Sequence, residues 1–196
     1  MTLFAPSPHV SDLIREHSLT LAHGSFGSPV TVPAAGRVDV QKFFPSESFA
    51  RQASAAYAEH SRRIRERLPH ADVRHVGGTS VPGLLTTGDV DLHVRVEPEA
   101  FAAARDVLRQ LYEPLYEDRW RESAYFFDPE SVPRVELALT EIGNIDDLHH
   151  GEAWRRIAND PDLVERYNDL KRACEGRSTE EYAAAKRDFF YDNFSL

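Results

Sequence analysis

Two aspartates separated by one residue, Asp89 and Asp91, are the first candidates for chemistry in this sequence. They stand at the start of an apolar run that predicts a β-strand, on which every second side chain points to the same side. Two carboxylates on one side of a strand repel each other unless a cation lies between them. In nucleotide sites, Mg²⁺ takes one or two carboxylates together with substrate phosphates. The spacing therefore predicts a Mg²⁺ site for phosphate chemistry.

A glycine-rich turn precedes the aspartates and consists of Gly77, Gly78, Thr79 and Ser80. The two glycines would let the backbone approach a phosphate closely, and the two hydroxyl residues add donors and exposed N–H groups. We expect these four residues to hold the phosphates of a nucleotide.

A third carboxylate, Glu136, lies in a later run, residues 134–140, where apolar residues occupy alternate positions. The apolar side chains would face the core, and Glu136 would face the opposite side. If this strand lies beside the strand of the aspartates, the three carboxylates would form a two-metal phosphoryl-transfer site.

Basic residues in the C-terminal third are candidates for binding the phosphates. Lys186, Arg155 and Arg156 lie in predicted helices and could clamp a triphosphate. Residues of this type in a helix are more often ordinary surface charges. Only three of the 23 basic residues are lysines, at positions 42, 171 and 186.

The elements that must position these residues follow from hydrophobic periodicity, capping residues and turn residues. Helices are expected from about residue 46 to 68 and at 98–112, 151–158, 161–175 and 179–193, and strands at 72–76, 90–96, 124–128 and 134–140. This order predicts an α+β fold, a small mixed sheet flanked by helices with a helical C-terminal third. Residues 1–36 are expected to be an N-terminal extension, with a short helix at 12–22 and a loop, and residues 37–196 the main domain.

Composition excludes several classes of protein. With 41% hydrophobic residues among 196, the chain can build a core, so it is not disordered throughout. No apolar run approaches the roughly 18 residues that a membrane span needs, so we expect no membrane association. A net charge of −9 argues against a protein that coats nucleic acid through its phosphates. The first ten residues lack the pattern of a signal peptide, which favours the cytoplasm.

The sequence offers residues for two alternatives to phosphate transfer, a transition-metal site and a serine hydrolase. His93 would share the side of the aspartates and could line the site, whereas His149 and His150 lack the i, i+4 spacing of a helical zinc pair. We expect those two histidines at a solvated helix start. Ser80 stands in no G-x-S-x-G elbow, which argues against a serine hydrolase.

The turn and the aspartates resemble the signature of the GrpB-like family, within the nucleotidyltransferase superfamily of DNA polymerase beta type. The resemblance covers residues 38–194 and rests on residues 75–84 (HVGGTSVPGL) and 88–92 (GDVDL), with a similar C-terminal stretch at 161–167 followed by Lys171, Tyr182 and Lys186. It implies a nucleotidyltransferase-like fold for residues 37–196. It also implies that Asp89, Asp91 and Glu136 are metal ligands and catalytic residues. The chain differs from the family at two places. It has Thr87-Gly88 where the family usually has Lys-Pro, and Glu136-Leu137-Ala138 where many relatives have His-Leu-His.

The function expected from the residues and the resemblance is a Mg²⁺-dependent nucleotidyltransferase. Such an enzyme transfers a nucleotidyl group from a nucleoside triphosphate to a hydroxyl acceptor. The base and the acceptor are left open by the sequence. The alternative is a catalytically inactive nucleotide-binding or regulatory module with the same fold.

Overall fold

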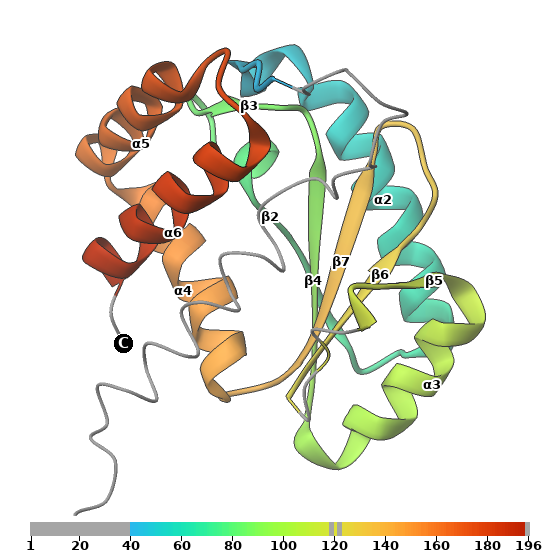
Figure 1. The fold of residues 1–196 in the computed structure, drawn as a ribbon. Coiled ribbons are helices and arrows are strands. Elements are labelled where there is room, and N and C mark those ends of the chain that lie inside the picture. Colours follow the sequence, from blue (N-terminus) through green and yellow to red (C-terminus); the bar gives the residue numbers. More distant parts are fainter. Residues whose placement is uncertain (1–39, 118–119, 121–122, 195–196) are drawn as a thin grey trace, which may run out of the picture.

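A computed structural model of the chain describes residues 40–117, 120 and 123–194 (Figure 1). The helix expected at 12–22 and the loop after it lie outside these residues. The described part has the α+β architecture that the order of the elements predicted, with a mixed sheet and a helical C-terminal third.

The sheet has five strands in the described part of the chain, in the order β2-β4-β7-β6-β5. Their bounds are β2 Asp72–Val76, β4 Val90–Val96, β5 Glu113–Leu115, β6 Ala124–Asp128 and β7 Val135–Glu141. The two central strands, β4 and β7, are parallel, and all other pairs in this sheet are antiparallel. Because β4 and β7 are parallel neighbours, residues far apart in the sequence meet at the same end of the sheet.

Helices cover both faces of the sheet (Figure 1). Helices α2 (Ala50–Arg67) and α3 (Phe101–Leu111) pack on one face, where the apolar residues of β4 and β7 form the main core. Helix α4 (Ile145–Asn159) lies on the other face, and α5 (Pro161–Cys174) and α6 (Thr179–Phe194) extend this helical group. No helix among the described residues is long and apolar enough to span a bilayer.

Alternation along β4 gives the sheet two different faces. Val90, Leu92 and Val94 are fully buried in the core with α2 and α3. The residues between them face α4, where Arg95 forms a two-pronged ion pair with Asp147. The face that carries the aspartates is therefore polar along its length, as the spacing of apolar residues predicted.

Helix α4 begins six residues earlier than the sequence pattern predicted. The side chain of Asn144 accepts a hydrogen bond from the backbone N–H of Asp147 and caps the helix. His150 is therefore in the middle of α4 and is buried, with its ring centroid 5.3 Å from that of His93. The expectation of a solvated helix start at His150 is wrong, because the cap lies further upstream.

A second, two-stranded sheet was not predicted, because its strands are only two residues long. Strand β1 (Phe44–Pro45) pairs antiparallel with β3 (Leu85–Thr86). Three short 3₁₀ segments complete the described elements: η1 Ser46–Ser48, η2 Gly78–Ser80 and η3 Pro98–Ala100. The glycine-rich turn is thus an ordered 3₁₀ turn between β2 and β3.

The helical C-terminal third has its own apolar cluster. Trp154, Tyr167 and Phe189 pack together with Val81 and Leu84 from the segment that follows the glycine turn. This contact holds the helices against the end of the sheet at which β4 begins.

Candidate functional site

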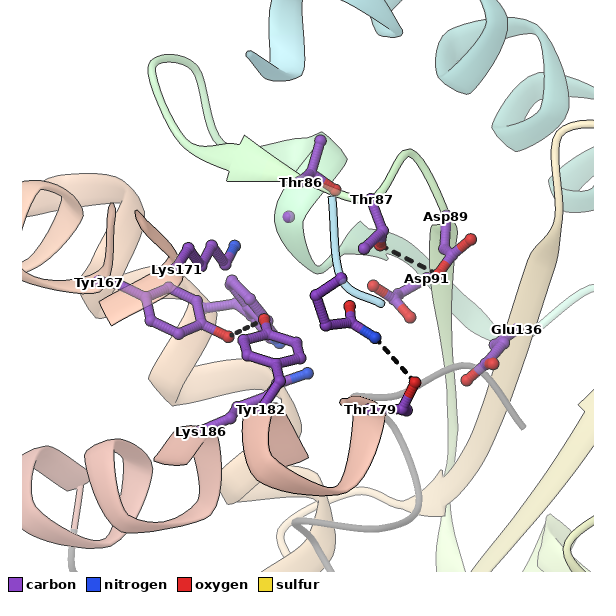
Figure 2. A pocket seen from close by; sticks show the side chains of 13 residues that line it. Thr86, Thr87, Asp89, Asp91, Glu136, Tyr167, Lys171, Thr179, Tyr182 and Lys186 are labelled. Carbon is purple, nitrogen blue, oxygen red and sulfur yellow. Dashed lines mark hydrogen bonds between the residues drawn. The ribbon is translucent and has the colours of Figure 1, made fainter. Parts of the chain in front are cut away.

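One cavity lies between the N-terminal ends of β4 and β7 and helices α5 and α6 (Figure 2). It is lined by residues from the sheet, the turn segments and the helices: Gln41, Gly78, Thr86, Thr87, Asp89, Asp91, Glu136, Trp154, Tyr167, Lys171, Thr179, Tyr182 and Lys186. The three predicted carboxylates therefore reach the same cavity, and Lys186 reaches it from the other side.

The carboxylates form a row across two parallel strands. Asp91 and Glu136 are paired in the β4–β7 register, so their side chains leave the sheet on the same side. Asp89 precedes β4 and also lines the cavity. Figure 2 shows the three side chains grouped on the sheet side, opposite the helices that carry Lys171 and Lys186.

Burial changes the acidity of two carboxylates. Burial raises the pKa of Asp91 to about 7; the positive charge of Lys186 opposes this rise and the negative charge of Asp89 adds to it. Burial also raises the pKa of Glu136 to about 8, and the neighbouring Asp91 raises it further. These carboxylates are therefore in a low-dielectric environment in which a nearby cation would be strongly favoured.

Glu136 has one oxygen without a hydrogen bond. Its Oε1 is buried and has no hydrogen-bond partner in the described part of the chain. Nη2 of Arg134 lies 3.0 Å from it, as an ion pair without hydrogen-bond geometry. A buried carboxylate oxygen is costly to leave unpaired, so Glu136 retains the capacity to accept a proton or a ligand.

Two lysines form the basic side of the cavity. Lys171 of α5 and Lys186 of α6 are only 3% and 5% exposed. Burial lowers the pKa of Lys186 to about 7, opposed by the charge of Asp91. Burial also holds the pKa of Lys171 well below its usual value, and the positive charge of Lys186 acts in the same direction. Bound anions would favour the charged form of both amines.

Lys171 is also tied to its surroundings. Its Nζ donates a hydrogen bond to the backbone carbonyl of Leu85 and lies 4.1 Å from the centroid of the Tyr167 ring. The amine is therefore fixed beside β3 and the glycine turn, at the edge of the cavity.

The glycine turn makes room for side chains of the site. Gly77 has φ +77°, and a Cβ built on it would lie 2.6 Å from Cγ of Asp91. A Cβ on Gly78 would lie 2.8 Å from Oγ1 of Thr86 and 3.7 Å from Nζ of Lys171. Only a residue without a side chain fits at Gly77, because the carboxylate of Asp91 occupies that space.

The two hydroxyl residues of the turn donate hydrogen bonds to backbone carbonyls, not to the cavity. Oγ1 of Thr79 donates to the backbone carbonyl of Asp89, and Oγ of Ser80 donates to that of Gly77. Neither side chain, nor Gly77, is among the residues that line the cavity, whereas Gly78 is. Thr79 and Ser80 thus brace the turn and the start of β4.

Arg155 and His93 are not brought to the cavity. Arg155 is exposed on α4 and forms an ion pair with Glu152 of the same helix. His93 is buried further along β4, where its Nε2 is 2.8 Å from Oγ1 of Thr140. Both had been candidates because of their residue type and position in a predicted element, and neither lines the cavity.

Lys171 and the tyrosines of the cavity were not predicted as site residues, although the sequence contains a signal for them. A tyrosine precedes each buried lysine by four residues, as Tyr167 and Lys171 on α5 and as Tyr182 and Lys186 on α6. Residues four apart lie on one side of a helix. The two tyrosine hydroxyls are 3.2 Å apart, so the two helices present equivalent sides to the cavity.

The fit of a metal ion can be judged from the donor atoms. Among the described residues, no group of three or more His, Cys, Asp or Glu side chains is placed to hold a metal ion. Mg²⁺ in nucleotide sites needs only one or two carboxylates, because phosphates and waters supply its other oxygen ligands. Asp89 and Asp91 satisfy this smaller requirement in number and in ligand type. The donor set thus fits Mg²⁺ held jointly with a phosphate.

Comparison with known proteins relates most of the chain to one family. Residues 48–195 match the sequence model of the family described as GrpB protein. A UPF0157 protein of Vibrio cholerae is 27% identical over 152 residues, which are 77% of this chain and 80% of that protein.

Two solved structures have related folds. The conserved protein GrpB from Enterococcus faecalis superposes with a TM-score of 0.53 at 19% identity, over 73% of this chain and 87% of that one. The poly(U) polymerase Cid1 gives a TM-score of 0.42 at 13% identity, over 68% of this chain and 41% of that one. The first similarity supports the fold, and the second is too low to support a conclusion about this chain.

Proposed function

The chain belongs to the GrpB protein family, and we propose that its cavity is the site of a Mg²⁺-dependent nucleotidyl transfer. The substrate would be a nucleoside triphosphate, and the acceptor would carry a hydroxyl group. The base and the acceptor are not specified by the proposal.

A single observation carries the proposal. A row of three carboxylates on the sheet, Asp89, Asp91 and Glu136, faces two buried lysines on the helices across one cavity. Burying so many ionisable groups is costly in their charged forms unless a ligand or a function offsets the cost. A metal–phosphate complex offers positive charge to the carboxylates and negative charge to the lysines, so it matches both sides of the cavity.

The carboxylates would divide two tasks. Asp89 and Asp91 would hold Mg²⁺, which when bound offsets the negative charge of the phosphate oxygens. Glu136 would accept the proton of the acceptor hydroxyl through Oε1, which has no hydrogen-bond partner in the described part of the chain. A carboxylate whose pKa is raised to about 8 is a stronger base than an exposed glutamate.

The lysines and the turn would hold the phosphates. Lys186 and Lys171 would contact the phosphate oxygens from α6 and α5, and Gly78 of the turn lines the cavity beside them. In the transfer, a bond forms between the acceptor oxygen and the α-phosphorus. The bond from this phosphorus to the bridging oxygen breaks, and pyrophosphate leaves.

Calorimetric titration of the full chain with ATP, GTP, CTP and UTP tests the proposal. We expect at least one nucleotide to bind with Mg²⁺ and to bind at least about tenfold more weakly in EDTA, a loss of about 1.4 kcal/mol. The double variant Asp89→Asn/Asp91→Asn should lose binding, because it keeps the side-chain size and removes both charges. Unchanged binding in this variant would refute the assignment.

A matched control removes two charges elsewhere. Asp106→Asn/Asp188→Asn changes two exposed carboxylates outside the cavity and should bind nucleotide as the wild type does.

Pyrophosphate release then separates the two candidate functions. Release of pyrophosphate from the triphosphate in the presence of a hydroxyl acceptor indicates an enzyme. Mg²⁺-dependent binding without pyrophosphate release, whichever acceptor is added, indicates the catalytically inactive module.

A further inference from the structure

The segment of residues 40–46, here called the strap, runs beside the cavity. It connects the turn between α5 and α6 to strand β3 of the two-stranded sheet. At its first end, the backbone N–H of Gln41 donates to the carbonyl of Arg177, and the N–H of Gly176 donates to the carbonyl of Gln41, both at 2.9 Å. Val40 forms a β-bridge with Ser178. The strap is therefore fixed to the turn between α5 and α6.

The other end of the strap is fixed beside the glycine turn. Phe44 and Pro45 form β1 and pair with Thr86 and Leu85 of β3. Beyond them, the N–H of Ser46 donates to the carbonyl of Leu84 at 2.9 Å, and its Oγ donates to that of Val81 at 2.8 Å. The strap thus joins two walls of the cavity that are about 90 residues apart in the sequence.

Side chains of the strap alternate in their roles. Phe43 is buried, and its ring centroid lies 5.0 Å from that of Tyr182. Lys42 is exposed. Gln41 lines the cavity, and its Nε2 donates a hydrogen bond to Oγ1 of Thr179 at 2.9 Å. The amide of Gln41 is therefore held by Thr179 in a cavity that also contains three carboxylates and two lysines.

The orientation of this amide determines what it can recognise. Thr179 accepts from the nitrogen, so the carbonyl oxygen of Gln41 is left as an acceptor for a ligand. Phosphate oxygens at neutral pH offer no donor to a carbonyl oxygen, whereas ribose hydroxyls and the N–H groups of a base do. The carbonyl end of the amide thus suits the nucleoside part of a nucleotide.

We propose that Gln41 is a specificity-determining residue whose Oε1 accepts a hydrogen bond from the sugar or base of the bound nucleotide. This inference rests on the proposed function, because it needs the nucleotide in the cavity. It goes beyond the family relationship, since the match to the family begins at residue 48 and leaves the strap outside. The strap would then adapt a common cavity to the particular substrate of this chain.

The test compares two probes in the full chain, each with Mg²⁺: the nucleoside triphosphate that binds tightest, and tripolyphosphate, which has neither sugar nor base. Gln41→Ala should weaken binding of the nucleotide about tenfold, as expected for one lost hydrogen bond, and leave tripolyphosphate unchanged. Thr179→Val should show the same selective loss, because the amide loses its orientation. Lys42→Ala is the matched control on the strap and should bind both probes as the wild type does.

Two outcomes would overturn the inference while the proposed function stands. In one, Gln41→Ala binds the nucleotide as tightly as the wild type does. In the other, it loses affinity for both probes equally, which would indicate a structural role. If the wild type binds neither probe, the proposed function itself fails, and this inference fails with it.

Deoxy analogues identify the donor. If a ribose hydroxyl is recognised, the 2′-deoxy or 3′-deoxy nucleotide binds the wild type as weakly as the ribonucleotide binds Gln41→Ala. If a base N–H is recognised, both analogues bind the wild type as the ribonucleotide does, and both weaken in Gln41→Ala.

Discussion

The glycine at position 77 and the position of the Asp91 side chain depend on each other. The positive φ of Gly77 is unfavourable for other residues, and the space where a Cβ would lie is occupied by the carboxylate of Asp91. The sequence pattern assigned this glycine to phosphate binding. In the structure its immediate effect is to let Asp91 fold back against the turn.

Gly77→Ala should therefore displace Asp91 and abolish Mg²⁺-dependent nucleotide binding, measured by calorimetry. Gly83→Ala is a matched control, because Gly83 also has φ +77° but nothing lies within 4 Å of a Cβ there. We expect the control to lose about 1–2 kcal/mol of unfolding free energy from backbone strain alone and to keep binding. Equal binding in the two variants would contradict the role given to Gly77.

Lys186 illustrates a conflict between stability and function. A buried ammonium is costly to desolvate, so Lys186→Met should leave the unfolding free energy at pH 7 within about 1 kcal/mol of the wild type or raise it. The same variant should weaken binding of the Mg²⁺–nucleotide at least about tenfold, because a phosphate contact is lost. Urea unfolding and calorimetry measure the two effects. Lys42→Met serves as the control, and wild-type affinity in Lys186→Met would contradict the assignment.

Among the secondary-structure elements, most strands of the five-stranded sheet could be located from the sequence alone. The bounds of β2, β4 and β6 agree with the predicted ranges, because apolar alternation and turn residues mark them clearly. The predicted β7 was displaced by one residue. The pairing of β4 with β7 could be stated only as a condition, since neighbouring strands are chosen by tertiary packing rather than by local pattern.

The contact between α4 and the sheet contains a buried histidine pair, His93 and His150. Burial lowers the pKa of His150 to about 4, and the groups around it are Asp146, His149, Asp147 and Lys186. Burial also lowers the pKa of His93 well below its usual value, and the charge of His150 adds to this. Both rings are therefore neutral in the folded protein at pH 7.

Acid should destabilise this contact. Between about pH 6.5 and 4, the unfolded chain binds a proton at His150 that the folded protein does not, so the unfolding free energy falls as the pH falls. The full loss of unfolding free energy caused by His150 is about 3 kcal/mol. The raised pKa values of Asp91 and Glu136 act in the opposite sense, because protonation of these groups favours the folded state.

Comparison with His150→Phe isolates the histidine from the carboxylates. The stability of the wild type minus that of the variant should fall by up to about 3 kcal/mol between pH 7 and pH 4, measured by urea unfolding. The exposed His70→Gln variant should follow the wild type. A difference that stays constant with pH would contradict a neutral, buried His150.

At the scale of the whole molecule, the cavity exists because distant segments meet. It combines the strap, the start of β4, one residue of β7 and two C-terminal helices. Strand patterns identified Asp89, Asp91 and Glu136 as candidates, but no local pattern indicates that α5 and α6 fold over this end of the sheet. For the same reason, Arg155 and Lys186 were both candidates in the sequence, and the fold brings only Lys186 to the cavity.

The acidic residues behind the net charge of −9 fall into two groups in the structure, those on the surface and those that line the cavity. Surface acids such as Asp106 and Asp188 add to it without contacting the cavity. Within the cavity, a divalent cation would lie against the carboxylates, and the phosphates would lie between this cation and the two lysines. An acidic protein can therefore still bind an anionic substrate, provided that a metal ion accompanies it.

The decisive experiment for the proposed function is a crystal structure of the full chain with Mg²⁺ and a non-hydrolysable nucleoside triphosphate analogue. We expect Mg²⁺ within ligand distance of Asp89 and Asp91, about 2.1 Å, with the phosphates between Gly78 and the two lysines. A nucleotide bound elsewhere on the molecule, or a cavity in which Asp89 and Asp91 contact neither metal nor phosphate, would contradict it.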